Sequence, residues 1–157
     1  MIRIVPEPLT VDGFAPFGDV IECAGAPDKI INQGLCGRFH DRAGMDFSDG
    51  QAGISLFNAT PRSFPYTLDM MERHPDGSQA FIPMTQAPFL VIVASDDNGK
   101  PSAPRAFVTT SGQAINYHRN IWHGVCVPLH TPGLFAVVDS ICGSGHQPLP
   151  CAFYHLD

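Results

Sequence analysis

Two short segments hold the side chains best suited to acid–base or metal chemistry. In the first, Glu72 and His74 stand two residues apart, so on an extended strand both point to the same face. Gln79 follows the Asp76-Gly77 turn and can rejoin that face from the partnering strand. A carboxylate, an imidazole and an amide would then converge in one place, where they could bind a metal ion or move protons.

The second segment, residues 112–123, contains His118, His123 and the only tryptophan of the chain, Trp122. Trp122 is explained most simply as part of the core or of a pocket wall. If His123 meets the first segment, two imidazoles, a carboxylate and an amide oxygen would suit a divalent ion such as nickel, iron, manganese or zinc. These groups could equally form a metal-free polar network. The candidate metal ligands are Glu72, His74, Gln79 and His123.

The elements that must position these groups are predicted to be short β-strands. Turn dipeptides such as Asp49-Gly50 and Asn98-Gly99 separate apolar runs, and helical periodicity is poor. The clearest strands are expected at residues 54–58, 80–84, 89–94, 106–110, 124–129 and 134–141. A short helix is expected within 11–17, a helix or strand at 66–73, and a loop with one strand near 34–40 across residues 24–50. This pattern predicts an all-β sandwich or barrel.

Composition limits the classes of protein that the chain can belong to. Its 157 residues predict one domain, 1–157, and 44% hydrophobic residues suffice for a core. A net charge of −6 gives no basic footprint for nucleic acid. No apolar run is long enough to cross a membrane, and the prolines near the start do not fit a signal peptide, so we expect a cytoplasmic protein. The five scattered cysteines do not predict a disulfide framework.

The two chemical segments have the spacing of the two motifs of the cupin superfamily. The first cupin motif places His-x-His before an acidic residue five positions later, and here Glu72, His74 and Gln79 take those positions. The second motif is matched in order by Gly112, His118, Asn120 and His123. Two of the four ligand types differ from the superfamily pattern.

Several longer segments of the chain together form a specific pattern: Phe17-Gly18-Asp19-Val20-Ile21-Glu22, Ile31-Asn32-Gln33-Gly34, Arg38-Phe39-His40-Asp41, Met71-Glu72-Arg73-His74-Pro75, Gln79-Ala80-Phe81-Ile82-Pro83-Met84, Asn116-Tyr117-His118-Arg119-Asn120-Ile121-Trp122-His123 and Asp139. Through these segments the chain resembles the ureidoglycolate lyase family of small cupins from about Pro8 to Cys142, whereas residues 143–157 match no pattern that we can assign. The resemblance implies a single cupin-type β-barrel, a double-stranded β-helix or jelly roll with little helix. It also implies a homodimer whose activity nickel stimulates and that uses no organic cofactor.

The same resemblance implies a reaction, the cleavage of (S)-ureidoglycolate to glyoxylate and urea in allantoin breakdown. This reaction needs a base for the hydroxyl proton, an acid for the leaving nitrogen and a clamp for the carboxylate. The candidate bases are Glu72, His40, His118 and His123. The candidate clamps are Arg38, Arg73 and Arg119, although alternation turns Arg73 away from Glu72 and His74. Asn32 could bind the urea carbonyl, and Gln79 and Trp122 are further candidates for contact with substrate.

Two other functions remain open from the sequence. The ligand set permits another metal-dependent cupin enzyme, such as a dioxygenase or an epimerase, although a dioxygenase normally has a fuller set of histidines on its iron. A non-catalytic cupin that binds a small carboxylate is the third hypothesis. The chain contains no recognisable DNA-binding segment through which such a sensor could act.

Overall fold

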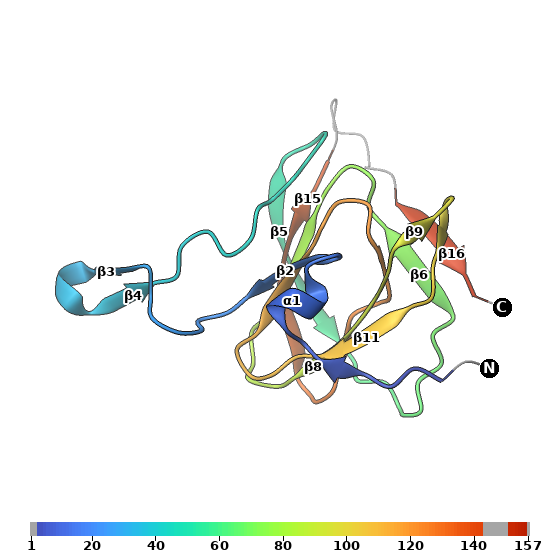
Figure 1. Ribbon diagram of the computed structural model, residues 1–157, viewed down its shortest axis with the longest axis horizontal. Helices are drawn as coiled ribbons and strands as arrows, with labels where there is room; N and C mark the ends of the chain where they lie inside the picture. The colour runs from blue at the N-terminus through green and yellow to red at the C-terminus, as the bar shows by residue number, and fades with distance from the viewer. Residues whose placement is uncertain (1–2, 143–150, 157) are drawn as a thin grey trace.

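The protein folds into two main β-sheets that face each other, with a hairpin projecting from one side (Figure 1). The computed structural model describes residues 3–142 and 151–156. The seven-stranded sheet contains β1 (Glu7–Pro8), β11 (Arg105–Val108), β8 (Phe89–Ala94), β13 (Trp122–His123), β6 (Met70–Arg73) and β16 (Ala152–His155) in that order, with β14 (Val127–Pro128) also pairing β8. The five-stranded sheet contains β2 (Gly18–Ile21), β12 (Ala114–Tyr117), β7 (Gln79–Pro83), β15 (Gly133–Ser140) and β5 (Ala52–Ala59). All pairings in these sheets are antiparallel except that of β1 with β11.

Side-chain alternation along the strands fills the space between the sheets. In β15, Phe135 and Val137 are buried and face Phe81 of β7, whereas the residues between them are half-buried. The inner core joins these side chains to the helix α1 (Val11–Phe14), whose Phe14 contacts Phe107 edge-on at 5.7 Å. Such tightly packed aromatic and branched side chains hold the sheet faces together.

The seven-stranded sheet is covered on both faces. All six residues of β8 are buried, because its outer face packs in a second cluster that includes Met71, Ile92 and Trp122. Tyr66 and Leu68 from the segment before β6 lie against this cluster. A strand with two covered faces is hydrophobic throughout, which explains the unbroken apolar run of β8.

The sequence prediction of an all-β cupin-type fold with little helix is confirmed. Strands are present at 89–94 as predicted and, with shifted ends, at β5, β7, β11 and β15. The helix is shorter than the predicted range 11–17. Residues 66–73, for which a helix or a strand was expected, contain the strand β6. Of the predicted strand 124–129, only Val127–Pro128 is a strand. The short strands β2 and β16 were not predicted. Within the described residues, no helix is long and apolar enough to cross a membrane.

Residues 28–42 form an arm outside the two main sheets (Figure 1). The arm contains a hairpin of β3 (Lys29–Ile31) and β4 (Cys36–Arg38), joined by the 3₁₀ turn η1 (Asn32–Gly34), where only one strand near 34–40 was expected. Its turn uses positive φ angles at Asn32, Gln33 and Gly34. At the base of the arm, Arg42 forms an ion pair with Asp28 at 2.9 Å.

The remaining small sheet pairs β9 (Asp96–Asp97) with β10 (Lys100–Pro101) across a turn at Asn98-Gly99. Both turn residues have positive φ, as a tight hairpin turn of this kind requires. This hairpin follows β8 directly and carries Asp96 to the outer face of the seven-stranded sheet, where it contacts residues of β6 and β13.

Candidate metal and catalytic centre

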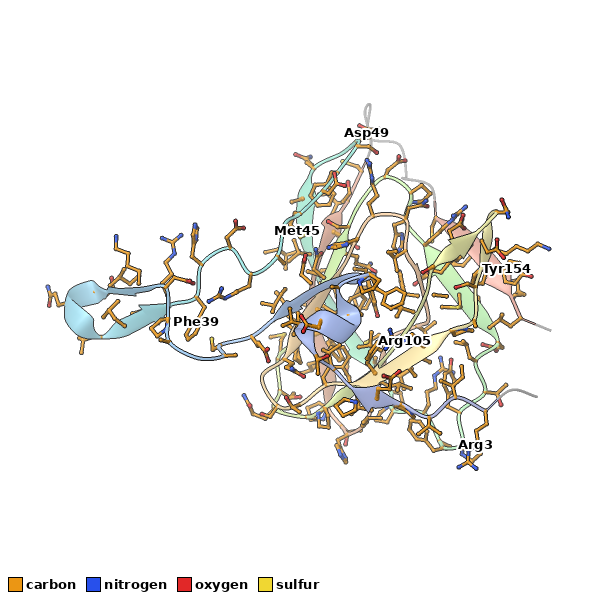
Figure 2. The ribbon with its side chains drawn as sticks, in the orientation of Figure 1. Arg3, Phe39, Met45, Asp49, Arg105 and Tyr154 are labelled. Carbon is orange, nitrogen blue, oxygen red and sulfur yellow. The ribbon has the colours of Figure 1, made fainter. Side chains whose placement is uncertain are left out.

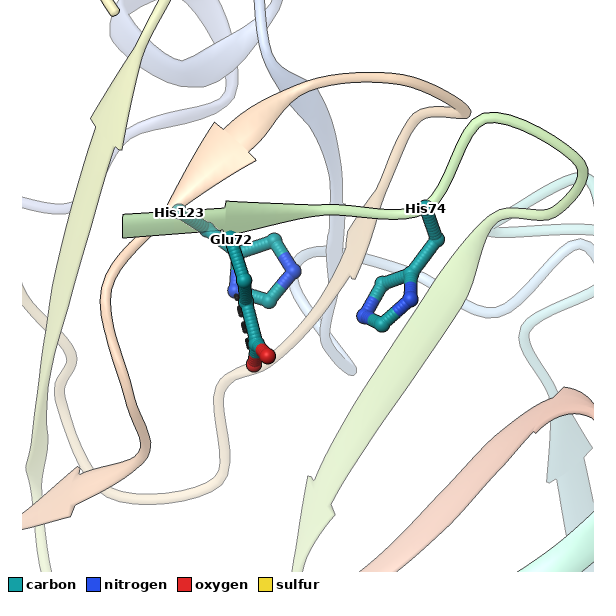
Figure 3. A group of neighbouring side chains, drawn as sticks. All are labelled: Glu72, His74 and His123. Carbon is teal, nitrogen blue, oxygen red and sulfur yellow. Dashed lines mark ion pairs between the residues drawn. The ribbon is translucent and has the colours of Figure 1, made fainter. Parts of the chain in front are cut away.

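Glu72, His74 and His123 converge inside the barrel and form a candidate metal site (Figure 3). One ligand atom from each lies within 4.8 Å of the others. Glu72 and His123 are directly opposite each other on the paired strands β6 and β13, and Glu72 Oε1 lies 4.0 Å from His123 Nδ1. His74 directly follows β6 and points to the same side as Glu72, as the two-residue spacing predicts.

His123 is held as a buried, neutral imidazole. Its side chain is 2% exposed, and Tyr117 stacks on it with ring centroids 4.3 Å apart and planes inclined by 6°. Burial, with a smaller contribution from His74, lowers the pKa of His123 to about 3. Its Nδ1–H can donate to the carbonyl oxygen of Gly124 at 3.1 Å, and this tautomer leaves Nε2 free to accept a proton or bind a metal.

Among the described residues, two buried atoms of this group lack a hydrogen-bond partner, Nε2 of His74 and Nε2 of His123, and so does the buried Oε1 of Gln79 on β7. A buried polar atom without a partner costs free energy, so such a group of atoms indicates a bound ion, water or substrate. Two imidazoles beside the carboxylate of Glu72 are a donor set that first-row divalent ions accept. The described residues therefore fit the divalent metal that the sequence predicts, and Gln79 contributes a further unpaired oxygen.

Gln79 is held in place by Asp139, one of the residues that the sequence singled out without assigning a role. The Gln79 Nε2 donates to Asp139 Oδ2 at 2.9 Å across the pair β7 and β15. Asp139 follows the inward alternation of Phe135 and Val137 along β15. This bond orients the amide so that its carbonyl oxygen is the atom left without a partner.

Tyr117 was not predicted as a site residue, although the structure places it against His123. Burial raises the pKa of the Tyr117 phenol, so this group remains protonated at neutral pH. The available signal was alternation, because Tyr117 precedes the polar His118 in a strand whose Ile115 is fully buried. An inward Tyr117 requires that the neighbouring His118 point outward.

Arg73 and Trp122 lie on the opposite side of their strands from Glu72 and His123. The Arg73 guanidinium forms an ion pair with Asp96 Oδ1 at 2.6 Å and stacks over Trp122 at 4.5 Å. The same Asp96 oxygen accepts a hydrogen bond from Trp122 Nε1 at 2.8 Å. Both residues are thus engaged in the outer cluster, as alternation predicts for Arg73.

His118 and Arg119 also lie away from the buried histidines. His118 Nε2 lies 3.1 Å from Asp19 Oδ1, and almost half of its side chain is exposed. Arg119 Nε lies 3.4 Å from Asp46 Oδ2. Neither residue therefore faces Glu72 within this chain.

Asn32, Arg38 and His40 all lie on the arm. Asn32 begins the turn of the hairpin, and Arg38 ends its second strand. Arg38 Nη2 donates to His40 Nδ1 at 2.8 Å, and all three residues are exposed. The structure therefore separates the predicted site residues into a buried group in the barrel and an exposed group on the arm.

A hollow of about 370 Å³ contains a further guanidinium, Arg62, that the sequence reasoning did not consider. The hollow is lined by Ala59, Thr60, Pro61, Arg62 and Cys126. Cys126 packs against the inner core cluster that includes Tyr117, and burial raises the pKa of its thiol to about 12. The Arg62 guanidinium carbon lies 5.5 Å from the ring of Tyr66.

The two-sheet β-barrel and its buried histidine–carboxylate centre define a cupin-type protein with a candidate metal site. A family model described as ureidoglycolate lyase matches residues 1–153. The chain belongs to the ureidoglycolate lyase family, and the resemblance found in the sequence is confirmed. The match extends past Cys142, where the sequence reasoning ended the resemblance.

Curated relatives support this assignment along most of the chain. The ureidoglycolate lyase of Rhodobacter capsulatus is 55% identical over 155 residues, covering 96% of both chains. The ureidoglycolate lyase of a Chelativorans species is 50% identical over 141 residues, covering 88% of this chain and 86% of the relative. That of Mesorhizobium japonicum is 49% identical over the same length and with the same coverage.

Proposed function

We propose that this protein is a ureidoglycolate lyase that cleaves (S)-ureidoglycolate to glyoxylate and urea in allantoin and purine breakdown. The observation that carries the proposal is the buried group of Glu72, His74 and His123, in a chain 55% identical to a curated ureidoglycolate lyase. The reaction takes place in one domain, residues 1–157, and in the cytoplasm. The five scattered cysteines, which include no C-x-x-C motif, agree with a reducing compartment.

The reaction requires one proton to leave the substrate hydroxyl and one proton to reach the urea nitrogen. As the oxygen loses its proton, a carbon–oxygen double bond forms, the carbon–nitrogen bond breaks, and its electron pair goes to the departing nitrogen. No water is consumed, so the products are glyoxylate and urea. Each correctly placed acid or base contributes about 10²–10⁴-fold to such a rate.

Glu72 is the best-placed base of the four that the sequence proposed. It belongs to the buried group, whereas His118 faces Asp19 and His40 lies on the arm. His123 is also in the group, but with a pKa of about 3 it is a weak base. We assign both proton transfers to Glu72, which takes the proton from the hydroxyl and returns it to the leaving nitrogen, so that His74 stays available to hold the metal.

The divalent metal of this site would be nickel, held by Glu72, His74 and His123 with Gln79 as a further oxygen donor. When bound, the ion would supply Lewis acidity toward the hydroxyl and carboxylate oxygens of an α-hydroxy acid. The support comes from the unpaired Nε2 atoms of both histidines and the unpaired Oε1 of Gln79.

The protein is proposed to act as a homodimer. The outer face of β5, β15 and β7 exposes a row of large apolar side chains, which a soluble monomer rarely leaves as one patch. Ile54 and Leu56 are more than 70% exposed, and Ile82 and Met84 continue the row across the sheet. The residues between them on β15, Ala136 and Val138, are also apolar.

The proposed function is tested by incubating the purified protein with racemic ureidoglycolate and measuring glyoxylate, urea and ammonia. We expect glyoxylate and urea in equal amounts, half of the racemate consumed, and no ammonia. Loss of activity with a chelator and its return with nickel are expected if the metal takes part. Ammonia without urea would assign a hydrolase instead, and oxygen uptake by the metal-loaded protein would assign a dioxygenase.

A further inference from the structure

We propose that the arm of one copy of the chain completes the catalytic site of a second copy, where Arg38 binds the carboxylate of the substrate. This inference rests on the proposed lyase function, because the substrate must be a small carboxylate. It also explains why the predicted site residues form two groups, one buried in the barrel and one exposed on the arm. The two observations that carry it are the engaged guanidinium groups of the barrel and the exposed cations of the arm.

Within residues 3–142 and 151–156, the barrel offers an anionic substrate few free cations. Arg73, Arg105 and Arg119 each form an ion pair with a carboxylate, namely Asp96, Glu7 and Asp46. Arg62 contacts the ring of Tyr66. The polar interior instead presents the carboxylate of Glu72 beside two histidines, and this carboxylate repels the carboxylate of a ligand. A carboxylate ligand therefore needs a positive charge from elsewhere, either a metal ion or a guanidinium.

The arm carries positive charges that are not neutralised within the hairpin. Lys29 and Arg38 are direct register partners across β3 and β4, so both point to the same face. Like charges opposite each other destabilise a strand pair, and an anion bound between them removes that cost. The described contact of Arg38 is a hydrogen bond to the neighbouring His40 rather than to a carboxylate. This face of the hairpin is suited to bind a carboxylate through bidentate hydrogen bonds from the Arg38 guanidinium.

The arm also exposes apolar side chains that a second copy could cover. Leu35 at the turn is 87% exposed and Ile30 is 55% exposed. Figure 2 shows the side chains of the arm, among them Phe39, standing clear of the barrel that carries Arg105. The hydrogen bonds and ion pairs described for residues 28–42 join arm residues to each other, for example His40 N to Asp28 Oδ2 at 2.8 Å. The barrel of its own chain therefore does not hold the hairpin.

The place where the arm leaves the barrel favours a second copy as its partner. The arm connects β2 and β5, the two edge strands of the five-stranded sheet. The outer face of this sheet carries the apolar row that includes Ile54 and Leu56. Two copies that bury these faces together would each direct an arm onto the other, in the reciprocal manner of a two-fold dimer.

The test is complementation between two defective chains, after the lyase activity of the unaltered protein has been established. Arg38→Ala and Glu72→Gln are each expected to lower kcat/KM by about 10-fold or more, through the lost clamp and the lost base. The two chains are co-expressed with different affinity tags, and the mixed dimer is purified with both tags. If the arm acts across the dimer, one of its two sites has both Arg38 and Glu72 intact. We therefore expect about half of the unaltered activity.

If the arm serves its own barrel, each site of the mixed dimer keeps one defect, and activity stays at the level of the parents. That result, or failure to recover any mixed dimer, would overturn the inference without affecting the lyase assignment. Arg3→Ala removes an exposed arginine outside the arm and is the matched control, expected to keep full activity. A loss in Arg62→Ala with none in Arg38→Ala would move the clamp to Arg62 and also contradict the inference.

A second readout does not depend on turnover. Chains labelled with ¹⁵N are mixed with unlabelled chains, allowed to exchange, and treated with a carbodiimide that joins amines to nearby carboxylates. Links from Lys29 to carboxylates of the barrel are expected to join a labelled to an unlabelled peptide. Links confined to peptides of the same label would show that each arm stays on its own chain.

Discussion

At the scale of single residues, Glu72 is the group whose removal should affect chemistry most and folding least. It is half-buried, and a glutamine of the same shape keeps the packing while removing the charge. We predict that Glu72→Gln lowers kcat by about 10²–10⁴-fold. Steady-state kinetics on ureidoglycolate measure this loss, with the melting temperature as the check on folding.

Glu7→Gln provides a matched control for Glu72→Gln. Glu7 is an exposed carboxylate on β1 whose partner is Arg105 at 3.2 Å, and an exposed pair of this kind contributes little to stability. The activity of the Glu7→Gln variant should equal that of the unaltered protein. Full activity in a folded Glu72→Gln variant would remove Glu72 from the role of base.

His123 should make the protein sensitive to acid. Its pKa is lowered to about 3 in the folded state, against an ordinary value near 6.5, so between these values the unfolded chain binds one more proton. The free energy of unfolding therefore falls as the pH drops through this range, by about 1.4 kcal/mol per pH unit at most. Urea unfolding with a chelator present, from pH 7 to pH 4, measures the slope. His123→Gln should show a smaller slope, and an unchanged slope would contradict a buried neutral His123.

Spacing and alternation predicted only part of the buried group and missed Tyr117. The two-residue spacing correctly placed Glu72 and His74 on one face, and alternation correctly turned Arg73 away. Alternation could also have turned His118 outward once Tyr117 was recognised as buried. The positions of Asn32, Arg38 and His40 could not be predicted, because local sequence patterns do not determine whether a hairpin packs on the main sheets or projects away from them.

At the scale of elements, the contact between β2 and β12 tolerates no side chain at Gly18. A Cβ there would overlap the backbone oxygen of Asn116 and crowd the ring of Phe14. Because backbone atoms cannot move aside cheaply, we predict that Gly18→Ala costs about 1–3 kcal/mol or more of stability. Denaturant unfolding measures the change.

Gly44→Ala is the matched control for Gly18→Ala. A Cβ at Gly44 meets nothing within 4 Å and its φ is not in the left-handed region. Its effect should stay within about 0.5 kcal/mol, the usual range for exposed positions. Equal stability of the two variants would show that β2 does not pair with β12 as described.

The strands that the sequence predicted best are those whose own composition decides their structure. The six apolar residues of β8 leave no alternative to a buried strand. The strand β2 is harder to predict because Gly18 and Asp19 have little strand preference, and only pairing with β12 makes the segment extended. The strand β16 depends in the same way on β6, where Phe153 stands opposite Glu72.

At the scale of the whole molecule, the apolar outer face of β5 should control the oligomeric state. Leu56 is 72% exposed in the single chain and lies in the middle of the row. We predict that Leu56→Lys, which places a charge in the proposed interface, converts the dimer to a monomer. Light scattering after size-exclusion chromatography measures the mass.

The control for Leu56→Lys is Val5→Lys, which makes the same change at a position 71% exposed outside the five-stranded sheet. It should remain a dimer. A dimeric Leu56→Lys variant would place the interface on another face. A monomeric Leu56→Lys variant that retains full lyase activity would argue against any exchange of arms between copies.

The indole of Trp122, which the Asp96 carboxylate links to Arg73, can serve as a fluorescent reporter of the site. Trp122 is the only indole in the chain, is 1% exposed, and directly precedes His123 in β13. Its emission should therefore lie at short wavelength while β13 is paired with β6 and shift to longer wavelength when water enters. Fluorescence excited at the tryptophan band thus follows the opening of the strand pair that holds the catalytic centre, with no label attached.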